Sequence, residues 1–142
     1  MPTSDEINRA DVLRELGERA RRKHDLSAAQ AHYEQAVGLL RTADDPLKLA
    51  HTIRHLGDVH AASRHWSDAE SCFVEALEIY RSHPSPGQLD LANAIRPYAV
   101  LKTATGRHEE ARKLWAEAAE LYRAQEITAG VEECLRVLAE PR

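Results

Sequence analysis

The 142-residue sequence is poor in several residue types, and each shortage excludes a class of protein. Its two cysteines, Cys72 and Cys134, are too few for a disulfide framework and match no metal-ligand spacing, so we expect reduced thiols. The six glycines include no phosphate-binding loop, and no paired carboxylates or nucleophile motif indicate catalysis. Scarce glycine also favours helices over a β-sandwich.

Charge and hydropathy exclude further classes. The formal net charge of -4 provides no broad basic field, so we expect no nucleic-acid partner. No apolar run is long enough to span a membrane, and the first residues do not have the pattern of a signal peptide. We therefore expect a cytoplasmic protein without a membrane partner, whose length fits a single domain over residues 1–142.

What the sequence does contain is one pattern repeated three times. A small residue is followed twelve positions later by alanine, then by an aromatic residue and a second alanine. The small residues are Gly17, Gly57 and Ala99, and the sets that follow are Ala29–Tyr33–Ala36, Ala69–Phe73–Ala76 and Ala111–Trp115–Ala118. Such self-similarity predicts stacked helix pairs, because a small residue lets two helices approach while the aromatic fills the space between them.

Helix-start and helix-stop signals divide the chain into three pairs and a last helix. Thr3 and Glu6 have capping-box spacing, and Asp45-Pro46 and Ser85-Pro86 each place an N-cap before a proline. The predicted pairs cover residues 4–43, 46–83 and 86–124, with breaks near residues 24, 64 and 106, and a capping helix covers residues 128–140. Among these breaks only Gly106 readily takes left-handed backbone. Apolar stripes are expected at Leu13, Leu16 and Ala20, and at Val131, Cys134, Leu135 and Leu138.

The repeated residues resemble the tetratricopeptide repeat family, in which Leu16-Gly17 and Leu56-Gly57 would be the Leu-Gly pairs. The resemblance implies an all-α, right-handed α–α superhelix, a solenoid that binds proteins without catalysis or cofactor. The offsets of about 40 and 42 residues exceed the usual 34 and resemble the longer units of kinesin light chains and some bacterial signalling regulators. Tyr98-Ala99 departs from Leu-Gly, and His60 and Lys102 stand where the family often has tyrosine.

In this family the first helix of each pair lines the concave groove, where peptides bind. Arg14, Arg54 and Arg96 each lie three residues before the small residue of their repeat and would form a ladder along that groove. Because the guanidinium fork suits carboxylates, the ladder predicts an acidic protein or peptide partner. Chance in a sequence rich in arginine is the alternative.

Neighbouring residues complete the predicted site. Arg14 is expected to pair with Glu18, and Arg54 with Asp58, each four residues further along the helix. His51 shares the face of Arg54 and belongs to the predicted peptide-binding residues.

Arg96 differs because Val100 stands at its i+4 position, so we expect it to be free unless Glu132 pairs with it. Pro97 should kink this helix, which either reshapes the groove around Asn93 and Arg96 or is merely tolerated. The two-carboxylate clamp of chaperone-binding relatives needs asparagines and lysines in the groove. Glu18, Asp58 and Val100 stand there instead, so that specificity is not indicated.

Two alternatives to peptide binding stay open. The chain could self-associate as a homodimer or serve as a structural piece of a larger complex, because solenoid ends and outer faces can drive dimers. A more remote alternative is a metal-dependent enzyme, in which His51, His55 and Asp58 share a helical face at i, i+4 and i+7. No HExxH motif or cysteine pair accompanies that triple, so we expect no metal and no enzyme.

Overall fold

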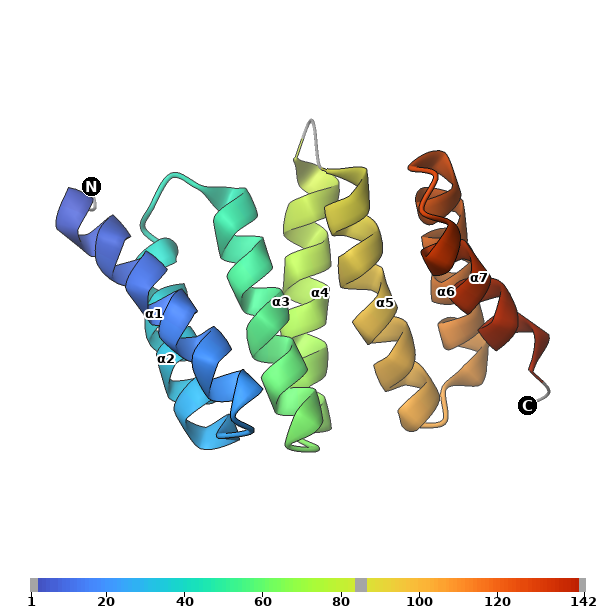
Figure 1. Cartoon of the computed structure of the whole chain (residues 1–142), viewed down its shortest axis with the longest axis horizontal. Coiled ribbons are helices and arrows are strands. Elements are labelled where there is room, and N and C mark those ends of the chain that lie inside the picture. Colours follow the sequence, from blue (N-terminus) through green and yellow to red (C-terminus); the bar gives the residue numbers. More distant parts are fainter. Residues whose placement is uncertain (1–2, 84–86, 141–142) are drawn as a thin grey trace. The chain divides into compact units, whose positions relative to one another are not determined.

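The computed structural model describes residues 3–83 and 87–140, and over these residues it has seven α-helices and no strand (Figure 1). The helices are α1 (Ser4–Arg22), α2 (Leu26–Leu40), α3 (Pro46–Ala62), α4 (Trp66–Ser82), α5 (Gln88–Ala104), α6 (His108–Ala124) and α7 (Thr128–Ala139). Contacts within the chain define two compact units, Met1–Ile79 and Tyr80–Arg142, and each is described by itself. The prediction of three helix pairs and a last helix is confirmed.

The predicted helix starts are formed by side-chain caps. The Thr3 hydroxyl accepts a hydrogen bond from the backbone N–H of Glu6, and the Glu6 carboxylate accepts one from Thr3, which is a complete capping box. The Asp45 carboxylate accepts from the N–H of Lys48, with Pro46 at the start of α3. The predicted start at Ser85-Pro86 lies outside the described residues, and α5 begins at Gln88.

The turns that follow α1, α3, α5 and α6 share one backbone geometry. A residue with positive φ, between 57° and 79°, ends α1, α3, α5 and α6; these residues are His24, Arg64, Gly106 and Glu126. The N–H of the residue that follows donates to a carbonyl five residues earlier, for example from Asp25 to Ala20 at 2.9 Å. The breaks are confirmed, but the sequence indicated left-handed backbone only at Gly106. At the other three turns this hydrogen bond offsets the cost of about 1–2 kcal/mol that a Cβ atom adds in this conformation.

Small and aromatic residues pack as the repeat predicts. A Cβ atom on Gly17 would lie 2.9 Å from the Tyr33 ring, and one on Gly57 would lie 2.7 Å from the Phe73 ring. All three predicted aromatics, Trp115 included, are buried. The absence of a side chain at each glycine therefore lets the aromatic ring pack against the backbone of the neighbouring helix.

Two predicted stripe residues are exposed. Leu16 on α1 is 37% exposed and Leu135 on α7 is 48% exposed, whereas Leu13, Ala20 and Cys134 are buried. Residues 88–104 form one α-helix that continues through Pro97. None of the helices in residues 3–83 and 87–140 is long and apolar enough to cross a bilayer.

Candidate functional site

The first unit has a pocket of about 350 Å³ beside α1, α2 and α3. Its lining residues are Asp11, Arg14, Glu15, Glu18, Arg21, Tyr33, His51 and His55. The lining includes Arg14, Glu18 and His51 of the predicted site. Arg54 and Asp58 reach the same cluster through His55, since the Nη2 atom of Arg54 lies 3.5 Å from His55 Nε2.

Two arginines of α1 meet two histidines of α3 in this pocket. The Nη2 atom of Arg14 lies 2.9 Å from His51 Nδ1, and the Nη1 atom of Arg21 lies 2.8 Å from His55 Nδ1. The two imidazoles are one helical turn apart and meet edge to face, with ring centroids separated by 4.5 Å and Nε2 atoms separated by 3.3 Å. The four side chains therefore form one contiguous group.

The ring nitrogens of this group cannot all pair a donor with an acceptor. A guanidinium only donates hydrogen bonds, so a ring nitrogen that accepts from it carries no proton, and the proton of each ring then lies on Nε2. The two Nε2–H groups of His51 and His55 then face each other across 3.3 Å. The other tautomer of His55 only moves the mismatch, because its Nδ1–H would face Arg21 at 2.8 Å. The donors of the two arginines and two histidines therefore converge in a pocket whose lining also holds the carboxylates of Asp11, Glu15 and Glu18.

His51 is neutral in this environment. Burial is the largest cause, and together with the charges of His55, Arg54 and Arg14 it lowers the pKa of His51 from 6.5 to about 4. Near neutral pH Arg14 therefore donates to an uncharged ring nitrogen.

The predicted pair between Arg14 and Glu18 is wrong. Glu18 instead accepts from Arg22 at 2.6 Å, while Arg14 turns toward α3 and lies 3.4 Å from Asp11. The reason is that Arg14 can reach His51 on the next first helix, a contact that a reading along a single helix does not include.

The predicted pair between Arg54 and Asp58 is also replaced. Asp58 lies 3.7 Å from the Nη2 atom of Arg21 and 3.6 Å from His55 Nδ1, so its partners come from α1 as well as from α3. Cross-helix contacts again decide the pairing.

Sequence reasoning missed Arg21 and Tyr33 as site residues. Arg21 lies outside the register that was compared between repeats, although its spacing of seven from Arg14 places both on one helical face. Tyr33 was assigned only to the core, yet its ring stacks on His55 with centroids 6.0 Å apart. Burial raises the pKa of Tyr33, while a hydrogen bond with Arg21 lowers it in part.

The predicted site residues of the second unit are already engaged. Arg96 forms a two-pronged pair with Glu133 of α7, with N–O distances of 2.6 and 2.8 Å, and this pair lowers the pKa of Glu133. The prediction of a free Arg96 is wrong, and the suggested competitor Glu132 is one residue away from the actual partner. Asn93 accepts a hydrogen bond of 2.8 Å from the Tyr122 hydroxyl. Because Arg14 and Arg54 lie in the other unit, the ladder stays a prediction.

His51, His55 and Asp58, the remote alternative of a metal site, are arranged differently from a ligand set. Asp58 approaches the Nδ1 side of His55, whereas His51 approaches its Nε2 side. Among the residues that the structure describes, a group with the spacing of metal ligands is His60, His65 and Asp68, at the turn from α3 to α4. The sequence singled out His60 only as a departure from the usual tyrosine.

A family model of the tetratricopeptide repeat matches residues 8–82. The chain belongs to the tetratricopeptide repeat family. Two solved structures are similar to it. The N-terminal domain of stress-induced protein-1 (STI-1) from C. elegans is 18% identical, with a TM-score of 0.69, and the match covers 93% of this chain and 98% of that one. The first repeat domain of Spaghetti (RPAP3), bound to the HSP90 peptide SRMEEVD, is 20% identical, also with a TM-score of 0.69, over 94% of this chain and 98% of that one.

These likenesses show the fold, an all-helical tetratricopeptide solenoid. None of the curated proteins compared with the chain matches it. The relation of the long repeat units to those of kinesin light chains stays a prediction.

Proposed function

We propose that the chain is a non-catalytic protein–protein interaction module, and that the pocket beside α1 and α3 binds an acidic segment of its partner. The observation that carries this proposal is the approach of the His51 and His55 ring nitrogens to 3.3 Å beside the guanidinium groups of Arg14 and Arg21. A carboxylate oxygen in this pocket accepts from both imidazoles.

The same ligand also improves the position of the arginines. Arg14 and Arg21 make their shortest hydrogen bonds to ring nitrogens, and His51 is neutral because its pKa is about 4. Their carboxylate neighbours, Asp11 and Asp58, lie further away, at 3.4 and 3.7 Å. A hydrogen bond from a guanidinium to a carboxylate is about twice as strong as one between neutral groups. An acidic side chain or a free carboxyl terminus in the pocket would therefore accept charge-assisted hydrogen bonds from the arginines and further hydrogen bonds from the imidazoles.

The comparison with solved structures supports an acidic ligand. One structure of similar fold holds a peptide whose sequence, SRMEEVD, is rich in carboxylates. Glu18 and Asp58 occupy clamp positions where chaperone-binding relatives carry asparagine or lysine, and they would repel a ligand held in that way. We therefore propose an acidic segment of a different sequence, recognised by Arg14, Arg21 and the two histidines.

Binding of a defined acidic peptide tests the proposal. The probe is a fluorescently labelled hexaglutamate with a free carboxyl terminus, and the matching glutamine peptide serves as its neutral counterpart. We expect Arg14→Gln and Arg21→Gln each to weaken hexaglutamate binding by at least about tenfold in fluorescence anisotropy, because hydrogen bonds to charged groups contribute about 1.5–3 kcal/mol.

Arg41→Gln is the matched control, because Arg41 pairs with Glu75 at 2.6 Å, neither residue lines the pocket, and its loss changes the net charge equally. An equal loss of binding in all three variants would indicate attraction to overall charge and would overturn the proposal. Light scattering separates the homodimer alternative, since a dimer that does not bind hexaglutamate favours self-association instead.

A further inference from the structure

The turn inside each helix pair carries three equivalent positions. They are a residue near the end of the first helix, the residue that follows the left-handed one, and the residue three further on. The first repeat has Ala20, Asp25 and Ala28, the second has His60, His65 and Asp68, and the third has Lys102, Arg107 and Glu110. In the second repeat these positions therefore hold two imidazoles and a carboxylate.

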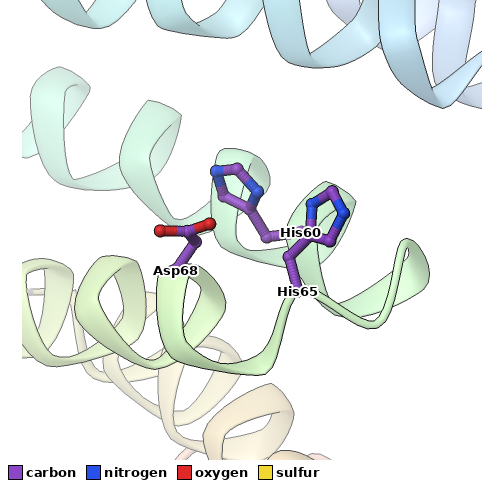
Figure 2. A group of neighbouring side chains, drawn as sticks. All are labelled: His60, His65 and Asp68. Carbon is purple, nitrogen blue, oxygen red and sulfur yellow. The ribbon is translucent and has the colours of Figure 1, made fainter.

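The backbone holds the three side chains of the second repeat close together. The N–H of His65 donates to the carbonyl of His60 at 2.8 Å, which closes the turn between α3 and α4. Figure 2 shows the three side chains next to one another, with His60 from α3, His65 from the turn and Asp68 from α4. One ligand atom from each of His60, His65 and Asp68 lies within 4.8 Å of the others, and the imidazole centroids are 5.9 Å apart.

His60 is the fixed member of this group. It is only 7% exposed, and its Nδ1 atom is buried without a hydrogen-bond partner. A buried ring nitrogen without a partner is unfavourable, and native proteins rarely leave one unexplained. His65 and Asp68 are exposed, so their side chains can rotate toward His60 with little cost to packing.

The third repeat shows what this position accommodates. Lys102 stands in the place of His60, is 6% exposed, and donates from Nζ to Glu110 at 3.2 Å. Glu110 stands in the place of Asp68. The third repeat thus carries its own cation at this turn, facing a carboxylate, whereas the second repeat has an imidazole and a carboxylate there.

We propose that His60, His65 and Asp68 bind a divalent transition-metal ion, with Zn²⁺ as the best-matched ion. Two imidazoles and one carboxylate form a ligand set that suits zinc and its neighbours, and they leave a fourth coordination position open. The ligand atoms of the three residues lie up to 4.8 Å apart. When the exposed side chains of His65 and Asp68 rotate toward His60, these distances shorten to the spacing of ligands around zinc. The end of α3 favours a cation and the start of α4 opposes it, so the helix dipoles largely cancel at the site.

Metal titration of the tag-free protein tests this inference. Co²⁺ serves as the spectroscopic probe, because its visible absorption reports coordination by imidazole and carboxylate, and Zn²⁺ serves as the competitor in calorimetry. We expect one equivalent to bind. His65→Ala and Asp68→Asn should each weaken binding by at least about tenfold, the smallest loss typical even for residues that only support metal ligands. Both residues are exposed, so neither variant should disturb folding.

Two other variants make the test specific. His108→Ala removes an exposed histidine outside the site and should leave the affinity unchanged. His51→Ala removes the other close imidazole pair. Loss of binding in His51→Ala with retention in His65→Ala would place the ion at that pair and overturn the inference. Absence of stoichiometric binding in the wild type would overturn it as well. Hexaglutamate binding by His65→Ala should equal that of the wild type, so failure here is distinct from failure of the peptide pocket.

Discussion

Arg14 in the first unit and Arg96 in the second occupy the same place in their repeats but have different partners. Each lies three residues before the small residue of its repeat, and each reaches a side chain 37 positions further along the chain. For Arg14 that side chain is the neutral His51, and for Arg96 it is the carboxylate of Glu133. One inter-repeat contact can therefore leave an arginine with a weak acceptor or bind it to a strong one.

The surroundings of the two arginines reinforce this difference. In the first unit, Arg21 contacts His55 as Arg14 contacts His51, and both imidazoles line one pocket. In the second unit, the Tyr122 hydroxyl also engages Asn93. Hydrogen-bond donors that face one another favour binding of a ligand that accepts from both. An ion pair whose groups already bond each other instead contributes to the stability of the folded unit. The comparison supports the proposal that the first unit, rather than the second, binds an acidic segment.

The largest effect should come from giving the first unit the partner found in the second. In His51→Glu, the new carboxylate pairs with Arg14 as Glu133 pairs with Arg96 and repels an acidic ligand. We expect hexaglutamate affinity to fall about 100-fold, because charge-assisted hydrogen bonds worth about 1.5–3 kcal/mol are lost. Fluorescence anisotropy measures the loss, and His108→Glu adds the same charge at an exposed site as a control. An affinity within twofold of the wild type would show that the pocket is not the binding site.

The next effect concerns the packing that holds Tyr122 in the second unit. A Cβ atom on Gly130 would lie 2.6 Å from Cγ of Tyr122, so Gly130→Ala must displace the ring whose hydroxyl holds Asn93. We expect the free energy of unfolding to fall by about 1–3 kcal/mol, as is typical of overpacking. Gly38 in the first unit is the matched control. A Cβ atom there meets nothing within 4 Å, so Gly38→Ala should stabilise α2 by about 0.5–1 kcal/mol. Urea denaturation distinguishes the two, and equal signs would contradict the packing.

The fold follows from the sequence more fully than the site does, and the reason is physical. Gly17 with Tyr33 and Gly57 with Phe73 are contacts within a repeat, so their fixed spacing predicts them. Partners between repeats depend on which face each helix turns toward the next. A reading along a single helix cannot supply that rotation, and Glu132 was accordingly named where the structure has Glu133.

Left-handed backbone escaped prediction for a related reason. Arg64 carries a side chain that disfavours positive φ, but the hydrogen bond from His65 to the His60 carbonyl outweighs that cost. This same bond brings the His60 and His65 imidazoles together. By residue type, the sequence indicated left-handed backbone at Gly106 but not at Arg64. It therefore did not predict that the His60 and His65 imidazoles lie close together.

The third prediction uses pH to separate the two units. The pKa of His51 is about 4 in the folded state and 6.5 when unfolded, so between these values the unfolded chain binds more protons. Stability of the first unit should fall as the pH drops from about 6.5 to about 4, by about 1 kcal/mol after allowing for solvent screening of a half-buried group. Glu133 has a lowered pKa, so its contribution is lost only below the usual value of 4.5.

Amide hydrogen exchange across this pH range measures both windows in the full chain. Exchange free energies of amides in α3 should decline first, and those in α7 should decline only at more acidic pH. His51→Gln should flatten the decline in α3 while leaving α7 unchanged. Parallel declines in both helices, with or without the substitution, would contradict the assignment of the first window to His51.

The smallest effect should come from Arg96. Its pair with Glu133 has ideal two-pronged geometry, but the Arg96 side chain is 45% exposed, so solvent screens much of the attraction. Arg96→Gln should lower the free energy of unfolding by about 0.5 kcal/mol, and a double-mutant cycle with Glu133→Gln should recover most of that value as coupling. Hexaglutamate affinity should stay within twofold of the wild type, since a saturated arginine has little left to offer a ligand. A tenfold loss of affinity in Arg96→Gln would mean that the ligand displaces Glu133, and the contrast between the two arginines would then describe only the unbound protein.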